Sequence, residues 1–144
     1  MIISVETSVI KIIRISEDLN TPFTKRFFTK TELDYLKNKD DASIACVMAT
    51  KEAVAKVLGA DFNNFDPRDV EVIYDISGKP IVELYGKMLE ATNVFVKRNK
   101  HCKSHDVYFA IQVCSSATDD IAVATAIILQ KRDKGNNIAC KAIS

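Results

Sequence analysis

The spacing of apolar and polar residues along the chain predicts a series of helices and strands. Residues 42–59 place apolar side chains at helical intervals, which predicts a helix with one stripe facing a core. Gly59 follows the last apolar residue of this pattern. A glycine there favours the left-handed backbone conformation in which many helices end. Within residues 49–59, four polar positions fall outside the apolar stripe: Thr50, Lys51, Glu52 and Lys56.

Five segments have the pattern of strands. Residues 1–9 alternate apolar and polar side chains, so one face of this strand is expected to be buried. Residues 107–113 and 121–129 are almost continuously apolar and are joined by a polar turn. The second of them has no polar side, which places it at the centre of a sheet. Residues 70–74 and 81–85 are expected to form a hairpin around a Ser-Gly-Lys-Pro turn.

The remaining segments are mostly helical. Pro22 lies in an expected loop, and the aromatic rings of residues 23–28 are expected to contact the helix that follows. Thr29 and Glu32 have the spacing of a capping box, which begins that helix. Residues 86–96 predict another helix. Its candidate core residues are Met88, Leu89, Ala91, Val94 and Phe95. Strands and helices in this order predict an α+β fold with a largely antiparallel sheet.

Length and composition narrow the possibilities. The 144 residues fit one domain, which we expect over residues 1–130, with a basic tail over 131–144. A net charge of +1 gives no reason to expect nucleic acid or an anionic membrane as a partner. No apolar run is long enough to cross a bilayer. Four widely spaced cysteines indicate reduced thiols, so we expect a cytoplasmic protein.

Few residues suggest chemistry from their pattern alone. Glu52 and Lys56 lie four positions apart, in the order that favours a surface ion pair on a helix. The same carboxylate beside lysines could instead hold a metal-bound, phosphate-rich ligand, and the pattern does not decide between these readings. His101 and His105 have metal-ligand spacing, but the lysines and arginine around them would repel a cation.

Four segments, taken together and in order, resemble a known family. They are Asn20–Leu36, Ala49–Gly59, Asp69–Gly86 and Ile121–Ala126. The second resembles the signature A-x-K-E-A-x-x-K-x-L-G of the small 4'-phosphopantetheinyl transferases. The chain is similar to the holo-acyl-carrier-protein synthase type, and especially to the transferase domain of fungal fatty acid synthase. The resemblance implies the α+β 4'-phosphopantetheinyl transferase fold, in which an antiparallel sheet packs with helices, and a homotrimer.

The resemblance also implies an activity. The family moves the phosphopantetheine arm of coenzyme A to a serine of an acyl carrier protein and releases adenosine 3',5'-bisphosphate. Magnesium offsets charge at the reacting phosphate, and lysines meet the rest. Matched to this chain, the catalytic residues are Glu52 and Lys56. The residues toward coenzyme A are Lys51, Lys79 and Ser116. The residues around Mg2+ are Glu52, Glu6 and Ser8.

Several departures from the family pattern fall on the chemistry. Ser8 stands where the family has an aspartate that binds the metal, and Lys11 stands where an acidic residue often follows. Ala117 replaces the histidine of a Ser-x-Ser-His turn. Glu6 lies two residues before Ser8 on the same strand face, so its carboxylate could take the place of the missing ligand. Asp119 or Asp120 could also approach the metal.

These departures leave two alternatives to an active transferase. The chain could be a catalytically degenerate relative that acts as a binding or assembly module. It could also be a relative that uses the old pocket for other chemistry without magnesium. In that case Cys114, Ser115 and Ser116, at the former coenzyme turn, are the candidate residues.

Overall fold

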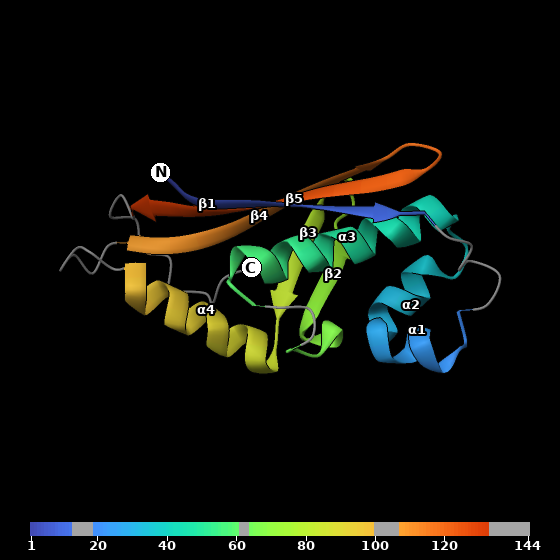
Figure 1. The fold of residues 1–144 in the computed structure, drawn as a ribbon, viewed down its shortest axis with the longest axis horizontal. Coiled ribbons are helices and arrows are strands. Elements are labelled where there is room, and N and C mark those ends of the chain that lie inside the picture. The colour runs from blue at the N-terminus through green and yellow to red at the C-terminus, as the bar shows by residue number, and fades with distance from the viewer. Residues whose placement is uncertain (13–18, 61–63, 100–106, 133–144) are drawn as a thin grey trace.

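The central feature of the fold is a three-stranded antiparallel sheet with helices on one face (Figure 1). The computed structural model describes residues 1–12, 19–60, 64–99 and 107–132. Its strand order is β1-β5-β4, with bounds Ile2–Lys11, Ile121–Arg132 and Val107–Ala117. Both pairings are antiparallel. The predicted α+β class and the central position of the strand that begins at Ile121 are therefore confirmed.

Helix α3, Asp41–Val57, lies along the inner face of this sheet. Asp40 caps its first turn by accepting a hydrogen bond from the Ser43 N–H, at 2.9 Å. Gly59 follows its last turn with a φ of +75°, as the sequence predicted. Small side chains on both elements allow helix and strand to approach closely. They are Ala45, Ala49 and Ala53 from α3, and Ala122, Ala124 and Ala126 from β5, all buried.

Helices α1, Pro22–Phe27, and α2, Lys30–Leu36, pack beside the N-terminal half of α3. Pro22 begins α1, although the sequence predicted a loop, because its missing N–H costs nothing in the first helical turn. The rings of Phe27 and Phe28 are buried in one cluster with Leu36 of α2, as expected, and also with Ile44 of α3, whereas Phe23 is exposed. The capping box between Thr29 and Glu32 is confirmed by both of its hydrogen bonds.

The hairpin of β2, Val70–Tyr74, and β3, Pro80–Leu84, forms a separate two-stranded sheet preceded by a 3-10 turn, η1, Pro67–Asp69. Its turn contains a glycine with positive φ, as predicted. Helix α4, Gly86–Asn99, follows.

Two of the five core residues expected in α4 are exposed. Met88 is buried and Phe95 packs edge-to-face on Phe109, but Leu89 and Val94 are exposed. An apolar side chain on a surface helix is common, and the sequence pattern alone could not tell these positions from core.

The last two strands are longer than the sequence indicated. The polar turn expected over 114–120 is shorter, because β4 continues through Ala117. Cys114 and Ser115 pair with Thr125 and Ala124 of β5. These polar residues remain in the strand because an antiparallel pair is joined by backbone hydrogen bonds, which do not depend on the side chains. Strand β5 likewise continues to Arg132, past the expected domain boundary at 130.

The structure describes only some of the cysteines, histidines and tail residues for which expectations were drawn from the sequence. Cys46 and Cys114 are free thiols, in agreement with the predicted reduced state. Cys102 and Cys140 lie outside the described residues, as do His101 and His105. Of the expected basic tail over 131–144, residues 133–144 are also outside them.

Candidate functional site

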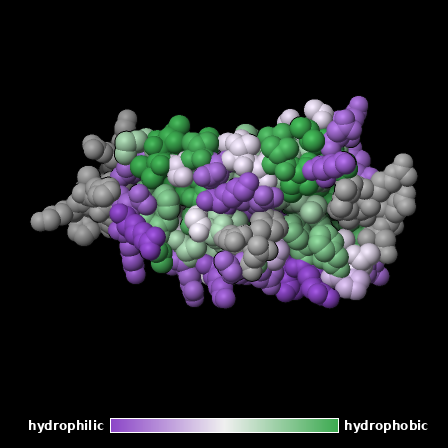
Figure 2. Space-filling model, viewed as in Figure 1, coloured by the Kyte–Doolittle hydropathy of each residue, from purple (hydrophilic) through white to green (hydrophobic). Residues whose placement is uncertain are grey.

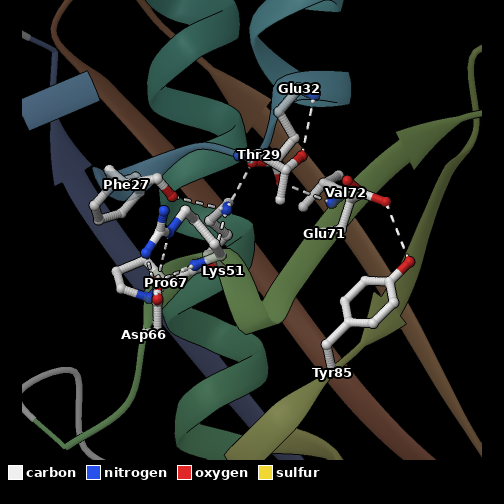
Figure 3. Close-up of polar contacts among 10 residues, drawn as sticks. Phe27, Thr29, Glu32, Lys51, Asp66, Pro67, Glu71, Val72 and Tyr85 are labelled. Atoms are coloured by element: carbon white, nitrogen blue, oxygen red, sulfur yellow. Dashed lines mark hydrogen bonds and ion pairs between the residues drawn. The ribbon is translucent and has the colours of Figure 1, made fainter. Parts of the chain in front are cut away.

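Lys51 is the most completely enclosed charged residue of α3. It was expected among the polar positions outside the buried stripe, but its side chain has no exposed surface, and Thr50 beside it is buried too. The Lys51 Nζ atom lies 2.7 Å from Glu32 Oε2 and donates to the backbone carbonyls of Phe27, at 3.0 Å, and Pro67, at 2.9 Å (Figure 3). These three partners use the three N–H groups of the ammonium. The structure therefore leaves Lys51 no proton to donate to a coenzyme phosphate.

Glu32 is the matching buried anion. Its carboxylate accepts hydrogen bonds from the N–H groups of Thr29 and Val72, each at 2.8 Å, in addition to the ion pair with Lys51. Burial raises the pKa of the Glu32 carboxyl, while the Lys51 charge opposes that change. Burial likewise lowers the pKa of the Lys51 ammonium, with Glu32 opposing. Each ion therefore depends on the other to remain charged in this interior.

The Glu32–Lys51 pair connects five parts of the chain. Its partners come from the end of α1, the start of α2, the middle of α3, the η1 turn and strand β2. The rings of Phe27 and Phe28 lie 5.6 Å from the Lys51 Nζ atom and shield it further. The pair therefore fixes the position of α3 at the residue just before Glu52.

Glu52 and Lys56 form the partly exposed pair that their spacing predicted. Lys56 Nζ lies 3.2 Å from Glu52 Oε1, and the side chains are 43% and 28% exposed, respectively. The same Nζ atom donates to the backbone carbonyl of Thr7 in β1, at 3.3 Å. The ammonium thus lies between α3 and the edge strand of the sheet, where solvent can reach it.

Ser8 follows Thr7 and is completely buried. Its hydroxyl has no hydrogen-bond partner among the described residues, which is uncommon for a buried polar atom. Glu6, on the same strand face, is exposed. Sequence reasoning placed both residues near Glu52 but gave no indication that Ser8 would be enclosed and unpartnered.

The other expected site residues lie elsewhere. Lys79 is exposed in the turn between β2 and β3, where its N–H donates to Asp75 Oδ1 at 2.9 Å. Ser116 is exposed near the end of β4, directly across from Val123. The structure therefore joins Glu52 and Lys56 by contact and places Lys79 and Ser116 on separate elements.

One further group of polar residues was missed by the sequence reasoning. The Tyr85 hydroxyl lies 3.4 Å from the Glu71 carboxylate (Figure 3). It donates to Glu83, the residue directly across from Glu71 in the hairpin, at 2.7 Å. The hydrogen bond to Glu83 raises the pKa of Tyr85 to about 12. The hydroxyl lies within hydrogen-bond distance of both carboxylates, which repel each other as like charges on paired strands. The alternation of the strands was the signal that could have placed them on one face.

Solved structures show which class of protein has this fold. A holo-ACP synthase of Plasmodium yoelii superposes with a TM-score of 0.64 and 24% identity, covering 89% of this chain and 94% of that one. A coenzyme A complex of the corresponding protein of Chronobacterium ammoniagenes superposes with a TM-score of 0.67 and 18% identity, covering 90% and 98%. The fold is therefore that of the holo-acyl-carrier-protein synthases.

Sequence comparison identifies the family. The family model described as the 4'-phosphopantetheinyl transferase superfamily matches residues 8–125. A holo-[acyl-carrier-protein] synthase of Clostridium botulinum is 37% identical over 128 residues, which cover 86% of this chain and 96% of the relative. One from Clostridium tetani is 43% identical over 99 residues, covering 66% and 79%. The chain belongs to the 4'-phosphopantetheinyl transferase superfamily. The expected closeness to the fungal fatty acid synthase domain stays a prediction.

The residues at the expected magnesium site do not fit a magnesium ion. Magnesium is usually bound through one or two carboxylates together with waters and substrate phosphates, in a near-octahedral shell of oxygens. Here Glu52 supplies a carboxylate that Lys56 already neutralises, and Ser8 supplies a neutral, enclosed hydroxyl. Within the described ranges, no three His, Cys, Asp or Glu side chains are grouped to hold a metal.

The helices can be compared with the length and apolar character that a membrane-spanning helix requires. None of the helices in the described ranges combines the length and the apolar character needed to cross a bilayer.

Proposed function

We propose that this protein transfers the phosphopantetheine arm of coenzyme A to a serine of an acyl carrier protein. The observation that carries the proposal is the family match over residues 8–125, within which Glu52 and Lys56 lie together at the signature helix. The relatives from Clostridium botulinum and Clostridium tetani are named holo-[acyl-carrier-protein] synthases. Coenzyme A is accordingly the substrate and an acyl carrier protein the partner.

The reaction makes specific demands on the site. The serine oxygen of the carrier forms a bond to the phosphorus that bears the pantetheine arm. The bond from this phosphorus to the bridging oxygen breaks, and adenosine 3',5'-bisphosphate leaves with the electron pair. The serine proton must pass to a base, and the charge on the phosphates must be offset. We assign to the Lys56 ammonium the task of offsetting the phosphate charge, and to the Glu52 carboxylate the task of accepting the serine proton. Both side chains are solvent-accessible and in contact with each other.

The other site residues have supporting roles in this proposal. Lys79 and Ser116 remain candidate contacts to the coenzyme, since both are exposed. We assign Lys51 a positioning role, because its three N–H groups are already bound within the protein. It holds the part of α3 from which Glu52 projects. The free thiols of Cys46 and Cys114 are consistent with a cytoplasmic location, which we also propose.

We further propose that copies of the chain associate through the outer face of the three-stranded sheet, as a homotrimer. The helices of the described ranges lie over the inner face (Figure 1), and apolar side chains form two groups along the sheet in the space-filling view (Figure 2). Val9 is 59% exposed, and Val5 and Ile121 are also exposed. Exposed apolar side chains gathered on one face are typical of a protein interface. Three copies that meet through this face around a threefold axis would bury them.

A transfer assay tests the proposed function directly. The full chain is incubated with coenzyme A and a purified acyl carrier protein, and the mass gain of the carrier is followed by mass spectrometry. We expect transfer by the native chain and a loss of at least 100-fold in Glu52→Gln, with the fold intact by circular dichroism. Lys30→Met, an exposed lysine on α2, serves as the matched control. A folded native chain that binds the carrier without modifying it would support a binding module instead.

A further inference from the structure

We infer that the cation at this site is the ammonium of Lys56, and that the chain holds no divalent metal between β1 and α3. The claim that the Lys56 ammonium meets the phosphates of the coenzyme rests on the proposed function. The part that concerns metal does not, because it can be tested with a metal ion alone.

The first argument is the position of the Lys56 ammonium. It bridges the two elements that would have to supply the metal ligands, with Glu52 Oε1 at 3.2 Å on one side and the Thr7 carbonyl at 3.3 Å on the other. An ammonium has three N–H groups, and these two contacts use two of them. The third is available to an anionic ligand, because the side chain is 43% exposed.

The second argument is the balance of charge. A divalent ion beside Lys56 would bring three positive charges together, and Glu52 is the carboxylate in contact with them. Like charges a few ångströms apart repel strongly, even where solvent screens them in part. Glu6 is exposed on its strand and is the acidic side chain that could contribute further. The experiment below therefore includes it.

The third argument is the state of Ser8. Its hydroxyl is neutral, enclosed and without a hydrogen-bond partner among the described residues. A carboxylate in the same place would be a buried charge that needs a cation beside it. The serine removes that need, so the position is stable without a metal. The serine therefore removes one expected metal ligand and, with it, the buried charge that a metal would offset.

Manganese binding tests the metal part of the inference. Mn2+ alone is titrated into the full-length chain and followed by electron paramagnetic resonance, for the native protein, Glu52→Gln, Glu6→Gln and Ser8→Asp. We expect the native chain to bind Mn2+ no more tightly than Glu52→Gln, and Ser8→Asp to bind at least tenfold more tightly. Tight native binding that is lost in Glu52→Gln or Glu6→Gln would overturn the inference. If Ser8→Asp does not fold, the comparison of the native chain with the two glutamine variants decides.

Nucleotide binding tests the role of Lys56. Adenosine 3',5'-bisphosphate is titrated calorimetrically into the native chain, Lys56→Met and Lys30→Met, each with and without Mg2+. We expect an affinity that changes less than twofold with Mg2+, falls at least tenfold in Lys56→Met and is unchanged in Lys30→Met. An affinity that requires Mg2+, or that survives in Lys56→Met, would overturn the inference. Absence of nucleotide binding in the native chain would overturn both the Lys56 role and the proposed function, whereas the manganese result would stand separately.

Discussion

Lys51 Nζ and Glu32 Oε2 lie 2.7 Å apart, and neither side chain has any exposed surface. Taking two charges out of water is costly, and the cost is recovered only when each ion has good partners. Here the ammonium has two further carbonyl partners and the carboxylate has two N–H donors. The pair lies beside the site residue Glu52, so its main consequence is the placement of α3 against its neighbours.

Removing one member of this pair should destabilise the fold strongly. We expect Lys51→Met and Glu32→Gln each to lower the free energy of unfolding by about 3–5 kcal/mol, because each leaves the other ion buried and unpaired. The double variant should lose clearly less than the sum of the two. Urea denaturation followed by circular dichroism measures all three, with Lys30→Met as an exposed control. Additive losses would show that the two side chains act independently.

Gly86 should not tolerate a side chain. It has a φ of +49°, and a Cβ atom there would lie 2.7 Å from Asp69 Oδ2. Gly78 has a φ of +80° but open space around it, so it provides a matched control with the backbone strain alone. We expect Gly78→Ala to cost about 1–2 kcal/mol of unfolding free energy and Gly86→Ala to cost more. Thermal unfolding of both variants measures the difference, and equal losses would contradict the predicted clash.

Asp40 should make stability depend on pH in acid. Its hydrogen bonds with the Ser43 hydroxyl and N–H lower the pKa of the carboxyl from its ordinary value of 3.8. The unfolded chain therefore binds the proton more readily, so this stabilisation is complete above pH 3.8 and is lost as the pH falls through the folded-state pKa. The Asp40→Asn variant has no carboxyl group to protonate at this position, so it lacks this dependence of stability on pH. Urea denaturation between pH 2.5 and about 6 should show the stability gap between native and Asp40→Asn shrink in acid. A gap independent of pH would contradict the assignment.

The proposed trimer contact should be sensitive to charge on the outer sheet face. Val9 is 59% exposed on that face, and Val94 is 47% exposed on α4. A lysine buried between copies would lack a partner, so we expect Val9→Lys to dissociate the assembly to monomers. Val94→Lys adds the same charge elsewhere and should leave the assembly intact. Light scattering coupled to size-exclusion chromatography measures the mass. A native chain that is already monomeric would refute the proposed contact.

Much of the candidate site could be predicted from sequence where its contacts are local. The Glu52–Lys56 pair follows from a spacing of four on a helix, and the capping box of Thr29 and Glu32 follows from a spacing of three. Both involve atoms that a single helical turn brings together. Ser8 was recognised as a departure from the family pattern, but its burial was not, because the strand alternation does not say what covers a face.

The sequence by itself determined α2, α3, α4, the hairpin and the central strand, because local hydrogen bonds and the periodicity of apolar residues encode them. The order of four motifs in the sequence indicated the family. Only the tertiary structure decided that Lys51 is buried against Glu32, since their partners come from five separate elements. It also extended β4 through polar residues, because pairing with β5 is a property of the backbone. The contact of Lys56 with Thr7 likewise depends on how α3 crosses β1, and no local pattern records such a crossing.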